Sequence, residues 1–171
     1  NIGFKIIDAI NAHFKLSKQK PKFKGLLTTG NIEEKKIYAI KPLTFMNNSG
    51  TAIKELIDYF KIDAKDVFVF HDDMDIDFGK IKAKFGGSSA GHNGIESIDK
   101  FIGKDYSRVR IGIGHPKQKK KVNNHVLEDF KEDEEEKINE ITENIVKQLP
   151  TLIGKKIDLF SSKVNQDLNG I

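Results

Sequence analysis

Segments with the two-residue period of a β-strand alternate along this chain with segments that have the period of an amphipathic helix. The run Val67–Phe70 is apolar at every position, which is typical of a central strand covered on both faces. Around Ile81–Phe85 and Arg108–Ile113, apolar residues alternate with basic or small ones, as in strands that have one polar face. This alternation of elements predicts an α/β fold with a mixed, mostly parallel central sheet and helices on both faces.

The other elements follow from the same periodicities. Apolar residues at helical spacing predict helices, which lie around Phe4–Phe14, Ile53–Phe60, Ile95–Ile102, Glu132–Leu149 and Ile157–Leu168. We expect Asn48 or Ser49 to cap the second of these helices. Gly25–Thr28 and Ile37–Leu43 are predicted as a hairpin or two adjacent strands on either side of Thr29-Gly30-Asn31.

Composition limits the class of protein. The length of 171 residues suits a single domain, which we predict over residues 1–171, and 37% hydrophobic residues are enough for a core. The absence of cysteine excludes a disulfide framework, a thiol nucleophile and thiolate metal ligands, and it fits a reducing compartment. No apolar run approaches the roughly 20 residues that span a bilayer. We therefore expect a cytoplasmic protein without a membrane partner.

The net charge of +4 is unevenly distributed along the chain. Residues 128–140 hold eight acidic residues and two lysines, so the rest of the chain is distinctly basic. Of the 29 basic residues, only Arg108 and Arg110 are arginines. Such a distribution permits a polyanionic partner without requiring one.

A first polar cluster, Lys41–Gly50, connects a predicted strand to a predicted helix. It places Phe45, Met46 and Asn47 in the connecting loop. A turn followed by a helix cap would explain the same residues, and this segment alone favours that simpler interpretation.

A second cluster, His71–Asp75, directly follows the apolar strand. The acidic spacing resembles that of a calcium loop, but Phe78 and Lys84 stand where such a loop needs glycine and glutamate. A two-metal site would need further ligands from the other clusters, which offer mainly amides. Asp72 has the chemistry to orient a histidine base, and a plain turn remains the alternative.

A third cluster, Gly86–Gly94, nearly matches a phosphate-binding loop, but His92 and Asn93 replace its lysine and hydroxyl residue. The backbone N–H groups at the start of the following helix still favour an anion or a carbonyl oxygen. We expect His92 and Asn93 to be functional.

Taken together, four segments of the chain resemble bacterial-type peptidyl-tRNA hydrolase, in the order and with the spacing of that family. The matching segments are Lys41–Gly50, His71–Gly79, Gly86–Ile98 and Arg108–Pro116. The resemblance extends over nearly the whole chain. It implies an enzyme that hydrolyses the ester bond between peptide and tRNA, returns free tRNA to translation, and uses no metal or cofactor. The expected partner is peptidyl-tRNA, and we expect a monomer.

The resemblance also implies roles for individual residues. Asp72 matches the aspartate that supports the catalytic histidine. Asn47 and Asn93 match asparagines that bind the tRNA end and the peptide and organise the reaction centre. Phe45 matches an aromatic contact to the tRNA end, and Met46 lines the same cleft.

Three further positions complete this set. His92 matches a second histidine of the cleft, which is not the general base of the family. Lys84 and Arg110 resemble a basic pair that grips the terminal phosphate of the tRNA.

The chain departs from the family pattern at two places. Ala90 precedes Gly91 where the family usually has a pair of glycines, which matters only if that position needs a positive φ. Asn1 aligns just after the general-base histidine of the family, which we therefore expect just upstream of Asn1. Because neither His71 nor His92 occupies the position of the base, we expect residues 1–171 alone to lack normal hydrolase activity.

Two rival functions stay open. One is a non-catalytic RNA-binding homologue of the same fold. The other is a metal-dependent phosphodiesterase that uses His71, Asp72 and Asp75. Separately, the lysine run 117–121 is either a contact to tRNA phosphate or a solvated loop. The acidic helix from Glu132 resembles a mobile cover over the cleft of the family, although its charges also suit a solvent face.

Overall fold

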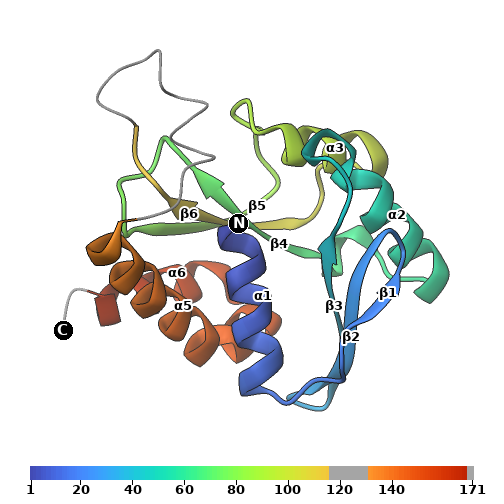
Figure 1. Ribbon diagram of the computed structural model, residues 1–171, viewed down its shortest axis with the longest axis horizontal. Coiled ribbons are helices and arrows are strands. Elements are labelled where there is room, and N and C mark those ends of the chain that lie inside the picture. The colour runs from blue at the N-terminus through green and yellow to red at the C-terminus, as the bar shows by residue number, and fades with distance from the viewer. Residues whose placement is uncertain (116–130, 169–171) are drawn as a thin grey trace. The chain divides into compact units, whose positions relative to one another are not determined.

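A computed structural model describes residues 1–115 and 131–168 (Figure 1). Its α-helices are α1 (Ile2–His13), α2 (Ser49–Phe60), α3 (Asn93–Ile102), α5 (Glu132–Ile153) and α6 (Ile157–Leu168). Its strands are β1 (Lys20–Lys22), β2 (Gly25–Ile32), β3 (Lys35–Pro42), β4 (Phe68–Asp73), β5 (Ile81–Phe85) and β6 (Ser107–Gly112). The predicted α/β class is confirmed. No helix in the described ranges is both long and apolar enough to cross a membrane.

Within the described residues the strands form two sheets, so the prediction of one mostly parallel central sheet is wrong. The first sheet has the order β1-β2-β3 and is antiparallel throughout. The second has the order β4-β6-β5. Its backbone hydrogen bonds join residue 107 to 67 and 113 to 73, which makes β4 and β6 parallel. They join 86 to 106 and 112 to 80, which makes β5 and β6 antiparallel. The second sheet is therefore mixed, as predicted.

The hairpin turn between β2 and β3 lies later than the sequence suggested. Thr29-Gly30-Asn31 continues β2, and the chain turns at Glu33 and Glu34, whose φ angles are 52° and 65°. Two successive positive φ values suit the right-handed twist of a hairpin, although Asn-Gly is the usual sequence there. Gly30 pairs with Ile37 in the strand, and a Cβ at this position would lie 2.5 Å from Leu16 Cδ2. Glycine at residue 30 thus reflects close packing and not a turn.

The chain divides into two compact units. The first comprises Asn1–Ile6, Phe70–Ala83 and the residues from Val109 onward. The second comprises Ile7–Val69 and Lys84–Arg108. A single domain over residues 1–171 stays a prediction.

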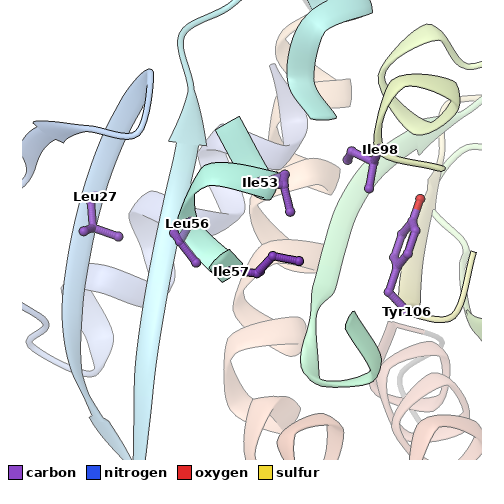
Figure 2. Packing of buried hydrophobic residues seen from close by; sticks show 6 residues of the cluster. All are labelled: Leu27, Ile53, Leu56, Ile57, Ile98 and Tyr106. Atoms are coloured by element: carbon purple, nitrogen blue, oxygen red, sulfur yellow. The ribbon is translucent and has the colours of Figure 1, made fainter. Parts of the chain in front are cut away.

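The core of the second unit joins β2, α2, α3 and the region of Tyr106 (Figure 2). The predicted inner face of α2 is confirmed, since Ile53, Leu56 and Ile57 are buried. Ile98 of α3 belongs to the same cluster, whereas Phe101 is partly exposed. Packing of α2 against α3 and β3 thus fixes both ends of the polar loop before α2 and the helix end of the loop before α3.

In the first unit, α6 covers the free edge of β5. The side-chain amide of Asn165 accepts a hydrogen bond from the Ile81 N–H (3.1 Å) and donates one to the Ile81 carbonyl (2.9 Å). The Ser161 hydroxyl accepts a bond from the Ala83 N–H (2.8 Å). Backbone groups at an edge need such partners when they are not paired with another strand. α6 also packs on α5.

A buried polar network lies beside the core of the second unit. Asp99 Oδ1 accepts hydrogen bonds from the Tyr106 hydroxyl and from Arg108 Nη2, both at 2.8 Å. The Arg108 guanidinium also lies 4.6 Å from the centre of the Tyr106 ring. Burial, and then the hydrogen bond to Asp99, raise the pKa of Tyr106 above its ordinary value.

This pKa shift predicts a loss of stability at alkaline pH. Below about pH 10 the phenol is protonated in both the folded and the unfolded chain, so the stabilisation is fully present. Above that pH the unfolded chain releases the proton and the folded protein keeps it, so unfolding becomes more favourable by up to about 1.4 kcal/mol per pH unit. Tyr106→Phe removes this dependence of the free energy of unfolding on pH. The variant should be less stable than the wild type below pH 10, and the difference should shrink above that pH. Urea unfolding from pH 8 to 11 checks this, and a constant difference between the two proteins would contradict it.

Candidate active site

The loop between β3 and α2 presents apolar side chains to solvent. Phe45 is 84% exposed, and Leu43 and Met46 are also exposed. Met46–Asn48 forms a single 3₁₀ turn, on which Asn47 is exposed. An aromatic ring so exposed beside a polar amide is a surface suited to a ligand with both a flat face and hydrogen-bonding groups.

The start of α2 is capped from another helix, and not by Asn48 or Ser49 as the sequence suggested. Asn48 makes no side-chain cap, and the Ser49 hydroxyl donates to the Met46 carbonyl (2.9 Å). The Gly50 N–H instead donates to Ser97 Oγ of α3 at 2.9 Å, in a buried position. The partner is 47 residues away, so no local motif reveals it.

Two glycines allow α2 and α3 to approach closely at this point. A Cβ on Gly50 would lie 2.3 Å from the Ser97 carbonyl oxygen, and a Cβ on Gly94 would lie 2.7 Å from Met46 Sδ. Since both distances are far below van der Waals contact, a larger residue at Gly50 would force the helices apart, and one at Gly94 would displace the Met46 side chain. The structure therefore brings the first and third polar clusters together within the second unit.

His92 has a structural task at the start of α3. Its Nδ1 accepts a hydrogen bond from the Ile95 N–H at 3.2 Å, so His92 is the N-cap of the helix. A nitrogen that accepts carries no proton, so the ring in this state is neutral and holds its proton on Nε2. Asn93, the first residue of α3, is exposed next to the helix N-terminus.

The loop before His92 depends on positive φ angles. Gly86, Gly87 and Gly91 have φ values of 72°, 108° and 79°, and Ala90 also has a positive φ of 48°. The departure from a glycine pair at Ala90 therefore falls on a position that strains an alanine. The exposed Lys84 precedes this loop, and its side chain runs along Gly87.

The second cluster belongs to the first unit, at the end of β4 and the turn after it. His71 is buried, and its Nδ1–H donates to the Asp72 carbonyl oxygen at 2.8 Å. The Asp72 carboxylate is half-buried. No group of three or more potential metal ligands occurs within residues 1–115 and 131–168.

Two side-chain contacts at this end of the sheet, one ion pair and one hydrogen bond between a histidine and a carboxylate, were not expected from the sequence. Arg110 Nε donates to the buried Asp73 carboxylate at 2.8 Å. His115 Nε2 lies 2.8 Å from Asp75 Oδ1, and both of these side chains are exposed. The alternation of polar and apolar residues predicts that the Arg110 side chain lies on a polar face of the strand. The pattern does not reveal which carboxylate Arg110 contacts.

A sequence model of the family described as peptidyl-tRNA hydrolase matches residues 1–170. The chain belongs to this family. The peptidyl-tRNA hydrolase of Pelagibacter ubique is 74% identical over 165 residues, which cover 96% of this chain and 89% of that protein. That of Ehrlichia ruminantium (strain Welgevonden) is 43% identical and covers 96% and 84% of the two chains.

Solved structures of the family share the fold. The crystal structure of peptidyl-tRNA hydrolase from Acinetobacter baumannii is 30% identical, with a TM-score of 0.89 over 96% of this chain and 85% of that one. The predictions of a peptidyl-tRNA hydrolase, of its hydrolase activity and of an α/β fold are therefore confirmed. The likeness extends far beyond the four motifs.

The cap between the two helices makes a prediction about stability. Ser97→Ala leaves the buried Gly50 N–H without its acceptor and should lower the free energy of unfolding by about 1–2 kcal/mol. Ser162→Ala, on the exposed side of α6, is a matched control that should change it by less than about 0.5 kcal/mol. Urea unfolding of both variants measures the difference. Equal stabilities would show that the cap contributes nothing.

Proposed function

We propose that this protein hydrolyses the ester bond between peptide and tRNA with water as the nucleophile and without a metal or cofactor. The observation that carries the proposal is that a member of this family holds the Phe45–Asn47 loop against the start of α3. The water oxygen attacks the ester carbonyl carbon, and a base takes a proton from that water. The bond to the ribose oxygen then breaks, and this oxygen gains a proton as free tRNA leaves.

Two histidines inside the motifs are poorly placed to serve as this base. The His71 ring is buried and donates Nδ1–H to a backbone carbonyl. His92 uses Nδ1 as a helix cap, so its Nε2 already carries the proton. The base is instead proposed to be another histidine, which the family resemblance implies.

Asp72 is proposed to orient this histidine and to keep it basic. A carboxylate hydrogen-bonded to one ring nitrogen leaves the other free to accept the water proton and stabilises the imidazolium that forms. A half-buried position at the end of a strand suits this task, because the surrounding structure limits the motion of the carboxylate.

Asn47 and Asn93 are proposed to bind the substrate carbonyl and the tRNA end. Their exposed amides provide N–H donors, which can stabilise the negative charge that develops on the carbonyl oxygen. Phe45 offers a ring on which a terminal base can stack, worth about 1–3 kcal/mol. Met46 lines the same surface, and the Nε2–H of His92 adds a donor.

Lys84 and Arg110 are proposed to bind a phosphate of the tRNA. The family resemblance implies this role for the pair. A lysine supplies charge for phosphate binding, and the arginine adds a directional donor. The lysine run 117–121 lies outside the described residues.

The rival functions are less well supported. The comparisons do not favour either the non-catalytic RNA-binding homologue or the phosphodiesterase. For the phosphodiesterase, His71, Asp72 and Asp75 do not form a metal-binding group within the described residues. Turnover that persists in a strong chelator would exclude the phosphodiesterase. We further propose a single-domain monomer in the cytoplasm, a reducing location that suits a chain without cysteine.

Asp72→Asn tests the catalytic role. Loss of the carboxylate should lower the single-turnover rate of peptidyl-tRNA cleavage by about 10²–10⁴-fold, because general-base catalysis contributes that much. Affinity for tRNA should stay within about threefold, since no phosphate contact is removed. Asp77→Asn, an exposed acid beyond the same strand, is the control and should leave both quantities near the wild-type values. Equal losses of rate and affinity in Asp72→Asn would refute the assignment.

A further inference from the structure

Asp73 has no role in the site described above, yet both oxygens of its carboxylate accept hydrogen bonds at the end of β4. The side chain is only 6% exposed. Its Oδ2 accepts a hydrogen bond from Arg110 Nε, and its Oδ1 accepts one from the backbone N–H of Asp75, each at 2.8 Å. Both oxygens are thus held, one by the neighbouring strand β6 and one by the turn that ends β4.

This arrangement constrains the arginine as well. A guanidinium is planar, so a hydrogen bond that its Nε–H donates to a fixed acceptor sets the plane and direction of the whole group. The Arg110 side chain is 26% exposed, so part of it reaches solvent while its Nε edge lies against a buried carboxylate. Asp73 therefore limits the rotamers that Arg110 can adopt before any ligand arrives.

We propose that Asp73 is a positioning residue for Arg110 and pre-orients its guanidinium for a phosphate of the tRNA. The inference rests on the proposed function, which makes Arg110 a phosphate contact. The benefit is entropic: an arginine that is already ordered loses less conformational freedom when it binds.

Electrostatics alone would act in the opposite direction. A carboxylate beside Arg110 offsets part of its positive charge and repels an approaching phosphate. If Asp73 were only a countercharge, its neutralisation would tighten tRNA binding. If it positions Arg110, its neutralisation weakens binding. The sign of the change therefore separates the two roles.

Asp75 provides a matched control for this comparison. It lies in the same turn, is exposed, and pairs with His115 instead of Arg110. Asp75→Asn removes the same unit of negative charge two residues away. It keeps the backbone N–H of residue 75, which donates a hydrogen bond to Asp73. Its effect on affinity is the electrostatic reference.

The experiment measures equilibrium binding of deacylated tRNA with an intact 5′-phosphate to the full protein at several salt concentrations. Asp73→Asn should weaken binding roughly 2- to 12-fold, the factor equivalent to ordering one long side chain. Asp75→Asn should bind as tightly as the wild type or more tightly. Arg110→Ala should weaken binding and lower the slope of log affinity against log salt by about 0.7–0.9. In the Arg110→Ala background, Asp73→Asn should cause no further weakening.

The outcomes distinguish the positioning role of Asp73 from the phosphate contact of Arg110. If Arg110→Ala weakens binding but Asp73→Asn tightens it or matches Asp75→Asn, Asp73 is a countercharge and the inference is wrong, while the phosphate contact stands. If Arg110→Ala changes neither affinity nor salt slope, the phosphate contact itself is wrong and the inference falls with it.

A second variant covers the case in which Asp73→Asn does not fold, as judged by its thermal transition. Arg110→Lys keeps the positive charge on a partly exposed side chain but lacks the planar group that Asp73 orients. The inference predicts weaker binding than the wild type with an unchanged salt slope. Wild-type affinity in this variant would show that the orientation of Arg110 does not matter and would overturn the inference.

Discussion

The hydrogen bond from the Gly50 N–H to Ser97 Oγ is the contact on which the arrangement of the second unit depends. It forms only because Gly50 has no side chain, which lets α2 lie directly against the Ser97 carbonyl. Each helix begins at a polar loop, so packing the two helices against each other also fixes the helix end of each loop. One loop carries Phe45 and the other carries Asn93. The same residues that stabilise the helix pair thereby set the geometry of the candidate active site.

Periodicity predicted many of the helices and strands, because apolar residues recur with the period of the element whose buried face they form. The apolar face of α2 and the exposed lysines of β5 follow directly from it. The polar face predicted for β6 is wrong, because β6 is the central strand of its sheet and even Arg108 is buried. Features that depend on distant partners could not be predicted in this way. Gly30 lies within a strand and packs closely against Leu16, and the cap of α2 comes from Ser97. The single sheet was wrong because strand pairing is a long-range property.

The motifs identified the candidate residues better than they identified the interactions of those residues. His92 looked like a cleft residue, and the structure adds that it caps α3 and thereby holds a defined tautomer. Arg108 and Arg110 looked alike in sequence, but Arg108 is buried with Asp99, whereas Arg110 is partly exposed and paired with Asp73. Both arginines are oriented by aspartates, which is consistent with a need for planar, directional donors in a chain whose other cations are lysines.

The central claim is that Asn47 and Asn93 act together at one reaction centre. A double-mutant cycle with Asn47→Ala and Asn93→Ala, measured by single-turnover cleavage of peptidyl-tRNA, tests it most directly. Each single substitution should lower the rate by roughly 10²–10³-fold, as expected for loss of one oxyanion donor. The double substitution should cost clearly less than the product of the two, because groups that act as a unit are not additive. Strictly multiplicative effects, or single variants with wild-type rates, would contradict the account.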